Sequence, residues 1–273
     1  MPGADYFSII SDFLVSGNRS MHLGLWDGPP DDDLPAAQAR LDAAVLSHAA
    51  LRSGMVVADV GCGVGGTLAR ANAVHSQMRL IGINPDAAQL VVAAEIRAQP
   101  GSEIRWHHGT AARLPLKDDT VDVVLSVEAA FHFDSRAAFL TEALRVLRPG
   151  GRLVLTDIVP TDAMRALGAG PAGVVLAVES LLQRSIGPIP DVWGLCPDWS
   201  TLVAAAGGRV LHHRDLTTQT LPSYRCFLTP AQRAGAGWAG RGRLMDEGVS
   251  LLEWLQSEGY VQVVLLVITR SMR

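Results

Sequence analysis

The sequence is poor in charge, in aromatic residues and in cysteine. Charged residues make up 18 % of the 273 positions, below the roughly 25 % that is usual for globular proteins. Three cysteines, an odd number at unrelated positions, argue against a disulfide framework, and no cysteine–histidine cluster has zinc spacing. We therefore expect a protein of the reducing cytoplasm that needs no metal.

Long runs of one kind are also missing. No block of lysine and arginine is present and the net charge is −4, which argues against a nucleic-acid partner. The most apolar run, Val261 to Thr269, is too short to span a bilayer, and the first residues lack the basic region of a signal peptide. Hydrophobic residues nevertheless reach 48 %, so a chain of this length can bury a large core.

The central block from Met55 to Asp157 alternates short apolar runs with helical stretches, the pattern of βαβ units and a parallel sheet. Beyond it the sequence predicts two late strands and further helices. The expected strands are Met55–Val60, Met78–Ile83, Glu103–His108, Val121–Ser126, Arg152–Asp157, Arg209–Asp215 and Val261–Thr269. The expected helices are Ala36–Leu51, Gly65–His75, Asp86–Ala98, Ser135–Leu147, Ala172–Gln183, Ser200–Ala206 and Asp246–Gln256.

A glycine-rich loop stands where the first central strand should meet a helix. Gly61, Gly63 and Gly66 satisfy G-x-G-x-x-G, so bare backbone and helix N–H groups could face a ligand. A dinucleotide site is one reading of this motif. Against it, Asp59 stands two residues before the first glycine, and the second strand ends at Asn84 where that site would have a carboxylate.

Three ordered motifs carry a family resemblance: V-A-D-V-G-C-G-V-G-G from Val57, L-P followed by D-T-V-D-V-V from Asp119, and L-R-P-G-G-R-L from Leu147. Together they resemble class I S-adenosylmethionine-dependent methyltransferases. Three flanking stretches resemble the branch that contains the erythromycin and rebeccamycin O-methyltransferases, enzymes of antibiotic and other secondary metabolism. These stretches begin at Met21 (M-H-L-G-L-W-D), Ser126 (S-V-E-A-A-F-H) and Gly187 (G-P-I-P-D-V-W).

The resemblance implies an α/β fold, with a Rossmann-like seven-stranded methyltransferase sheet that ends in an antiparallel strand pair. It implies an N-terminal helical cover over residues 1–51, a cofactor-binding core over 52–158 and a lid inserted after the fifth strand over 159–206. Residues 207–273 would complete the core sheet. A homodimer is compatible with this organisation.

The resemblance also places the cofactor, S-adenosylmethionine, and its product S-adenosylhomocysteine. Gly61, Cys62 and Gly63, preceded by Asp59, would lie under the methionine part, and His22 would close over it. Asn84, where relatives usually have an acid, and Gln89 would meet the ribose, while Thr110 and Ala111 would meet the adenine.

His132 is the candidate general base. The sulfonium already activates the methyl group, so a base is needed only when the acceptor is protonated at neutral pH, as an alcohol or phenol is. His132 follows the fourth expected strand at the carboxyl edge of the sheet, where open α/β folds bind ligands. Asp157, at the end of the fifth strand, is expected to orient the imidazole as in other His–Asp pairs.

Glu128 offers a second chemistry, because a carboxylate near the mouth could stabilise a carbocation and take its proton during C-methylation of a prenyl or aromatic substrate. Glu179, within an apolar helix, could do the same from the lid. A non-methylating cyclase or binding protein on the same fold, and an NAD-dependent reductase, remain alternatives. The sequence does not determine whether the acceptor atom is oxygen, carbon or nitrogen.

The low charge further predicts a hydrophobic small-molecule substrate. Six aromatic residues fall in segments that the resembled family folds over its substrate, and they are expected to line a cavity. They are Phe7, Phe13, Trp26, Phe131, Phe133 and Trp193.

Overall fold

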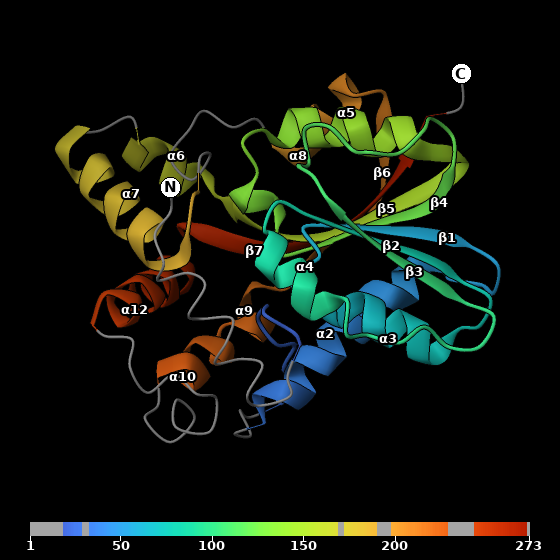
Figure 1. The fold of residues 1–273 in the computed structure, drawn as a ribbon. Helices are drawn as coiled ribbons and strands as arrows, with labels where there is room; N and C mark the ends of the chain where they lie inside the picture. The colour runs from blue at the N-terminus through green and yellow to red at the C-terminus, as the bar shows by residue number, and fades with distance from the viewer. Residues whose placement is uncertain (1–18, 29–32, 169–171, 190–197, 229–242, 272–273) are drawn as a thin grey trace.

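The computed structural model describes residues 19–28, 33–168, 172–189, 198–228 and 243–271, and of 167–168, 172–177, 179, 228 and 243–245 only the backbone. A seven-stranded sheet crosses the described residues in the order β3-β2-β1-β4-β5-β7-β6 (Figure 1). The strands are β1 Val56–Val60, β2 Arg79–Asn84, β3 Glu103–His108, β4 Val121–Val127, β5 Leu147–Pro160, β6 Gly208–Asp215 and β7 Val261–Arg270.

Helices connect and cover these strands. They are α2 Leu34–Ala49, α3 Gly66–Val74, α4 Ala87–Ala93, α5 Arg136–Val146, α6 Asp162–Gly168, α7 Ala172–Ile186, α8 Trp199–Ala205, α9 Thr217–Thr220, α10 Pro222–Leu228 and α12 Arg243–Ser257. A single 3₁₀ turn, η1 Ala130–His132, follows β4. Figure 1 shows α7 and α12 together near the beginning of β7, away from α3 and α4.

Strands β1 to β5 are parallel, and β7 pairs antiparallel with both β5 and β6. The strand order reverses between β1 and β4, since β2 and β3 lie to one side of β1 and the later strands lie to the other. Open α/β sheets bind ligands outside the carboxyl ends of their strands at such a reversal. The fold therefore directs attention to the loops that follow β1 and β4.

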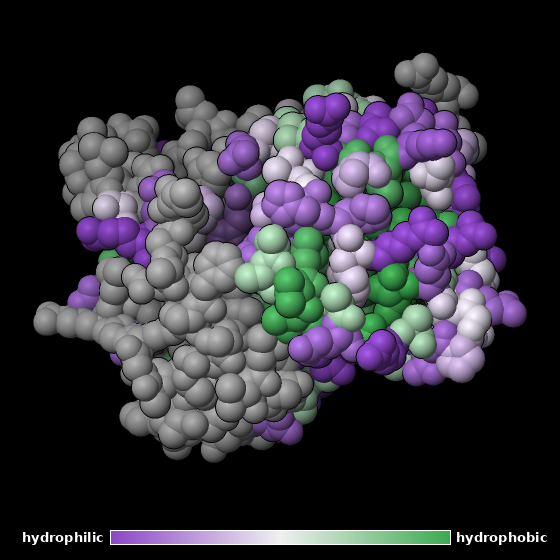
Figure 2. All heavy atoms as spheres, viewed as in Figure 1, coloured by the Kyte–Doolittle hydropathy of each residue, from purple (hydrophilic) through white to green (hydrophobic). Residues whose placement is uncertain are grey.

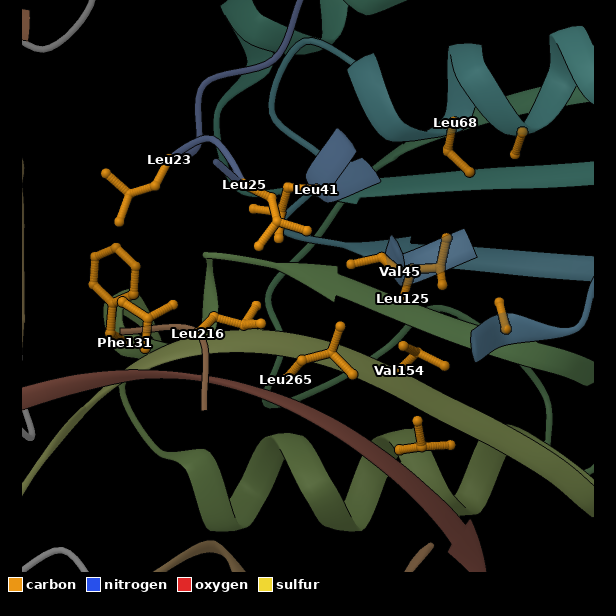
Figure 3. Close-up of a cluster of buried hydrophobic side chains, with 14 of the residues drawn as sticks. Leu23, Leu25, Leu41, Val45, Leu68, Leu125, Phe131, Val154, Leu216 and Leu265 are labelled. Atoms are coloured by element: carbon orange, nitrogen blue, oxygen red, sulfur yellow. The ribbon is translucent and has the colours of Figure 1, made fainter. Parts of the chain in front are cut away.

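The central strands β1, β4 and β7 are buried on both faces, which explains why they are apolar nearly throughout, whereas the edge strands β3 and β6 are partly exposed and carry charged and polar residues. On one face, side chains of α2 and α3 pack with strand residues such as Leu125 and Val154 (Figure 3). Leu23 and Leu25, from the segment before α2, join this same cluster. On the other face α5 and α8 pack against alternate residues of the same strands.

Helix ends follow the local sequence. Asp33 caps α2 by accepting from the backbone N–H of Ala36, and Ser135 caps α5 through Ala138 N. α5 ends at Val146, before Pro149, and Gly150 takes a φ of +80° in the turn into the body of β5.

Where Figure 2 colours the described residues, this face is mainly hydrophilic, with a hydrophobic patch over α4. Val91 of this helix is 71 % exposed. No helix among the described residues is both long enough and apolar enough to cross a membrane.

The strand predictions are confirmed, including the antiparallel pair formed by the last two strands. β5 is longer than expected because Leu147 pairs with Val121 and Pro160 pairs with Val261. Helix α4 ends at Ala93, earlier than expected, and continues only as turns. The short elements η1, α6, α9 and α10 were missed, since pieces of one or two turns leave little periodicity to read.

Candidate active site

The loop after β1 carries the glycine motif and lies at the carboxyl edge of the sheet. The backbone N–H groups of Gly61 and Cys62 donate to the carbonyl of Ile83, which ties the loop to β2. Gly61 has a φ of +77°, and a Cβ on it would lie 2.4 Å from Cβ of Ala129. Glycine is required there because the loop packs directly against the turn that follows β4.

Residues 19–26 cover this loop. A Cβ on Gly66, the first residue of α3, would lie 2.4 Å from the carbonyl oxygen of Arg19. The backbone N–H of Leu23 donates to Oε2 of Glu128 at 2.9 Å. The N-terminal segment is thereby fastened to both sides of the strand-order reversal, at the loop after β1 and at the end of β4.

His22 is buried within the covering segment. Its Nδ1 donates to the carbonyl of Leu23 at 2.7 Å, and its Nε2 lies 3.3 Å from Oδ1 of Asp42, within ion-pair distance. Burial alone would lower the pKa of His22, but the charge of Asp42, supported by Glu128, raises it to about 9. His22 is therefore a cation at neutral pH.

Asp42, on α2, is a buried carboxylate that sequence reasoning missed. Besides its ion pair with His22, it accepts hydrogen bonds from Thr67 Oγ1 at 2.7 Å, Arg70 Nε at 2.7 Å and Ser20 Oγ at 3.1 Å. Burial raises the pKa of Asp42, but the charge of His22 and these hydrogen bonds lower it to about 2. The available signal was an acidic residue on the apolar face of a helix, between Leu41 and Val45.

Asp59 and Glu128 are two further buried carboxyl groups at this edge. Burial, together with the charge of Asp42, raises the pKa of each to about 7, although the charge of His22 opposes the rise. Oε1 of Glu128 is buried and has no hydrogen-bond partner among the described residues. Glu128 also has a φ of +46°, a conformation that costs a non-glycine residue about 1–3 kcal/mol and that clusters at functional sites.

The end of β2 presents two amides. Asn84 Nδ2 donates to Oε1 of Gln89 at 2.9 Å, and both residues are buried. Gln89 Nε2 in turn donates to Asp86, the N-cap of α4. Two neighbouring polar side chains therefore lie where the family resemblance implies a ribose.

The turn after β3 holds Thr110 and Ala111. Gly109 N donates to the carbonyl of Asn84 at 3.1 Å, which places this turn beside the end of β2. Thr110 forms an isolated β-bridge with Arg113, and Ala111 is buried in the core cluster that contains Ile83.

His132 ends η1, just after β4. Its Nδ1 lies 2.7 Å from the carbonyl oxygen of Pro188, in the segment that follows α7. A carbonyl only accepts, so Nδ1 carries the proton and a neutral ring has its lone pair on Nε2. Burial, together with the charge of Arg136, lowers the pKa of His132 to about 4, and the bond to Pro188 only partly offsets this.

The expected contact between Asp157 and His132 is wrong. Oδ2 of Asp157 accepts from Arg136 Nε at 2.8 Å and from Trp199 Nε1 at 3.2 Å, while Pro188 occupies Nδ1 of His132. The physical reason is that a fully buried carboxylate needs a cation, and Arg136, the first residue of α5, supplies it.

The expectation that aromatic residues line a cavity is also corrected in part. Trp26 and Phe131 are 4 % and 7 % exposed and belong to core clusters, and Phe133 packs edge-on against Phe139. Phe7, Phe13 and Trp193 lie outside the described residues, as does the side chain of Glu179.

The positions that the sequence singled out thus gather at one edge, although they come from separate parts of the chain. β1 contributes Asp59 and the glycine loop, β2 the two amides, β3 the Thr110 turn, β4 Glu128 and His132, and the N-terminal segment His22. Residues that sequence reasoning missed hold this set in place: Ser20, Gln38, Asp42, Arg136, Pro188, Trp199 and Ser223. No group of three or more metal-ligating side chains occurs among the residues whose positions are described.

Comparison with known proteins agrees with this arrangement. Residues 58–155, from β1 into β5, match a family described as a methyltransferase domain. The chain is 32 % identical over 147 residues to an O-methyltransferase of Pyrenophora dematioidea (52 % of this chain, 54 % of that protein). It is 30 % identical over 220 residues to the sterol 24-C-methyltransferase of Pneumocystis carinii (80 % and 56 %). It is 30 % identical over 153 residues to the erythromycin 3''-O-methyltransferase of Saccharopolyspora erythraea (55 % and 50 %). The chain thus spans about half the length of these curated relatives.

Solved structures share the fold over nearly the whole chain. The cyclopropane synthase MmaA2 of Mycobacterium tuberculosis has a TM-score of 0.77 at 19 % identity, covering 96 % of this chain and 94 % of that one. The [4+2]-cyclase SpnF has a TM-score of 0.73 at 19 % identity, covering 98 % and 94 %. With the motifs, the strand order and the matched domain in agreement, residues 58–155 belong to the methyltransferase-domain family, as the resemblance to class I S-adenosylmethionine-dependent methyltransferases predicts.

Proposed function

We propose that this protein methylates an oxygen atom of a hydrophobic, secondary-metabolite-like small molecule, with His132 as the proton acceptor. The observation that carries the proposal is the hydrogen bond from Nδ1 of His132 to the carbonyl of Pro188. It selects the tautomer whose Nε2 can take a proton from a hydroxyl group. The erythromycin 3''-O-methyltransferase and the O-methyltransferase among the relatives support oxygen as the acceptor.

The residues of the site fit S-adenosylmethionine. When bound, this cofactor supplies a methyl group that its sulfonium has already activated. Two carboxyl groups, Asp59 and Glu128, stand buried beside the loop with only His22 as a nearby cation, and Oε1 of Glu128 lacks a partner among the described residues. Such carboxyl groups suit a ligand that carries a sulfonium and an ammonium group.

The remaining contacts follow from the positions around the edge. We assign the methionine part to the backbone of Gly61, Cys62 and Gly63, with His22 closing over it. We assign the ribose to Asn84 and Gln89, and the adenine to Thr110 and Ala111. The segment 19–26 would then exclude water from the methionine end.

His132 would act as the acceptor oxygen attacks the methyl carbon. As the acceptor oxygen took up the methyl group that the cofactor would supply, the hydroxyl proton would pass to Nε2 of His132 and leave an imidazolium. A hydroxyl group becomes strongly acidic while its oxygen is being methylated, so a base of low pKa suffices to take its proton. That low pKa keeps the base unprotonated at neutral pH.

C-methylation is the second candidate, and Glu128 favours it. Glu128 has a strained backbone, an Oε1 without a partner among the described residues and a pKa of about 7. At the carboxyl edge of the sheet, such a carboxyl group could take a proton from a carbocation. The sterol 24-C-methyltransferase among the relatives acts on carbon, according to its name. A cyclase that only carries the cofactor is the third candidate.

Turnover with product analysis tests the proposal. We expect stoichiometric S-adenosylhomocysteine and a new methyl ether when the protein receives S-adenosylmethionine and a panel of lipophilic alcohols and phenols. The carbon-13 shift of a labelled methyl group separates O-, N- and C-methyl products. A carbon-bound label would support the Glu128 chemistry, and a rearranged product without S-adenosylhomocysteine would reject methyl transfer.

Asp157→Asn tests how His132 is oriented. If the carbonyl of Pro188 sets the tautomer, the kcat of this variant, assayed below its melting temperature, should stay within about tenfold of that of the unaltered protein. Breaking a true His–Asp pair costs about 10⁴-fold in kcat in serine proteases. The variant leaves Arg136 without its counter-charge, so its stability should fall by about 3–5 kcal/mol. A loss of kcat near 10⁴ in the folded variant would restore the dyad.

A further inference from the structure

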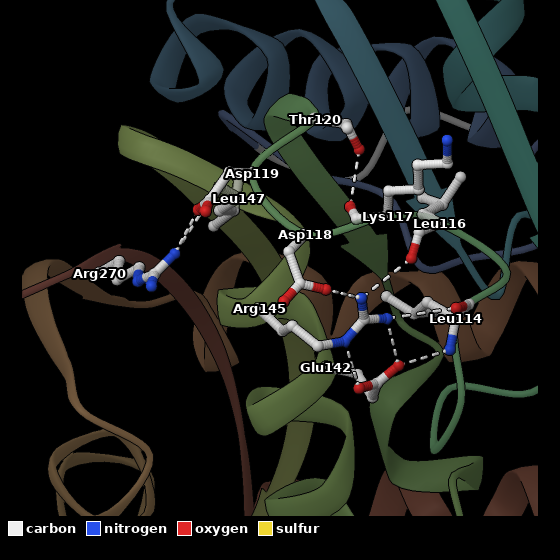
Figure 4. Close-up of polar contacts among 10 residues, drawn as sticks. All are labelled: Leu114, Leu116, Lys117, Asp118, Asp119, Thr120, Glu142, Arg145, Leu147 and Arg270. Carbon is white, nitrogen blue, oxygen red and sulfur yellow. Dashed lines mark hydrogen bonds and ion pairs between the residues drawn. The ribbon is translucent and has the colours of Figure 1, made fainter.

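An ion-pair network that the proposed chemistry does not use joins the segment after β3 to helix α5. Arg145 forms a fork with Glu142: Nε lies 2.7 Å from Oε1, and Nη2 lies 2.7 Å from Oε2. The same guanidinium donates to the carbonyls of Leu116 at 2.9 Å and Leu114 at 3.3 Å (Figure 4). It also pairs with Asp118 at 2.6 Å. One side chain thus holds three points of the segment.

Glu142 completes the clamp by accepting from the backbone N–H of Leu114 at 2.8 Å. The hydrogen bond to Arg145 holds the pKa of Glu142 below its usual range, so the pair stays charged. Only a planar guanidinium can make this combination of fork and carbonyl contacts, because a lysine ammonium is a single point charge. The side chain of Glu142 is 16 % exposed, which protects the pair from full solvent screening.

The clamp bears on the turn that holds Thr110 and Ala111. On one side this turn is bounded by Gly109, whose N–H donates to Asn84. On the other side the next fastened residue is Leu114, which is 3 % exposed and packs in the same cluster as Ala111. The turn therefore spans the short distance between the end of β2 and the clamp.

The far end of the segment is fastened separately. Asp119, with a φ of +56°, pairs with Arg270 of β7, and Thr120 Oγ1 donates to the carbonyl of Lys117 (Figure 4). These contacts do not involve Glu142 or Arg145, so the clamp is what fastens the stretch nearest the Thr110–Ala111 turn.

We propose that Glu142 and Arg145 are positioning residues for the adenine end of the cofactor. They would hold the Thr110–Ala111 turn in its binding geometry and so set cofactor affinity without touching the cofactor. The proposal rests on the function proposed above, which assigns the adenine to this turn. A preorganised turn avoids the ordering cost that a loose one would meet on binding.

Calorimetric titration with S-adenosylhomocysteine tests the clamp and needs no acceptor substrate. Arg145→Lys and Glu142→Gln should each raise the Kd by about tenfold. They should also reduce the ratio by which the protein binds S-adenosylhomocysteine more tightly than S-inosylhomocysteine, which differs only in the base. kcat at saturating cofactor should be unchanged. The matched control is Arg148→Lys, which alters another arginine–carboxylate pair, with Asp122 at 2.6 Å, and should leave both affinities unchanged.

The outcomes separate the two proposals. If the unaltered protein fails to bind S-adenosylhomocysteine, the cofactor assignment fails with the clamp. If it binds and both variants bind equally well, with only their melting temperatures lowered, the clamp is structural and the positioning role is rejected. A fall in kcat at unchanged Kd would also reject it, because that result would connect the segment to the acceptor.

Discussion

Replacing His132 with alanine should lower kcat by about 10²–10⁴-fold while leaving the affinity for S-adenosylhomocysteine unchanged, because general-base catalysis supplies an effect of that size. The lost group is the free Nε2 that the carbonyl of Pro188 leaves available. Steady-state kinetics with a methylated acceptor, together with calorimetry, measures both quantities.

His132→Asn separates the base from the structural contact. Its amide can still donate toward Pro188 but cannot act as a base, so kcat should fall as far as in the alanine variant. His75→Ala removes a histidine far from the carboxyl edge and should behave as the unaltered protein. Glu128→Gln should lower kcat far less than either His132 variant if oxygen is the acceptor. The reverse ranking would contradict the O-methylation mechanism and favour Glu128 as the base.

The pH dependence of kcat sharpens this prediction. Because the pKa of His132 is lowered to about 4, its neutral, base-competent form persists well below the ordinary value of 6.5. kcat at saturating cofactor should stay level from pH 8 to about pH 5 and fall only as pH approaches 4. A fall centred near 6.5 that remains in the Glu128→Gln variant would contradict the lowered pKa of His132.

Asp42→Asn should destabilise the fold by about 3–5 kcal/mol, since it leaves the buried His22 cation and Arg70 without their shared counter-charge. Urea unfolding followed by circular dichroism measures the change. Asp27→Asn is the matched control. Its ion pair with Arg40 spans 3.9 Å at the surface, so its loss should cost less than about 1 kcal/mol.

The difference in free energy of unfolding between the unaltered protein and Asp42→Asn should depend on pH in a defined direction. The pKa of Asp42 is lowered to about 2, so its contribution is complete above its ordinary value near 4 and is lost as pH falls toward 2. The pKa of His22 is raised to about 9, so its contribution is complete below 6.5 and is lost as pH rises through 9. The gap between the two proteins should be largest between about pH 4 and 6.5. A gap that stays constant up to pH 9 would mean that His22 is uncharged in the fold.

Much of the fold could be predicted because its signals are local. Short runs of six to nine residues predicted the ends of every strand except β5 to within one residue. The glycine and L-R-P-G-G motifs predicted the family. Most candidate residues at the carboxyl edge could be named for the same reason, because they lie near the end of a strand or in the loop or helix that follows it; His22, in the segment before α2, was named from the family resemblance alone.

The partners of those residues could not be predicted, because they come from distant parts of the chain. Asp157 and His132 were expected to pair since both stand at strand ends. Arg136 instead pairs with Oδ2 of the buried carboxylate, and Pro188, 56 residues beyond His132, accepts from Nδ1 of the imidazole. Asp42 was missed because its four partners converge on it only after α2 and α3 pack against the covering segment.

The low charge with which the sequence first stands out, and the positions of six aromatic residues, predicted a lined cavity, yet Trp26 and Phe131 pack in the core. By itself, the sequence determined the sheet, the glycine loop and the cofactor family, because these depend on backbone propensity and short-range motifs. Only the tertiary structure decided which charges neutralise one another and which nitrogen of His132 is free. Those outcomes follow from the requirement that every buried charge find a partner, and a partner can be chosen only once distant segments are in contact.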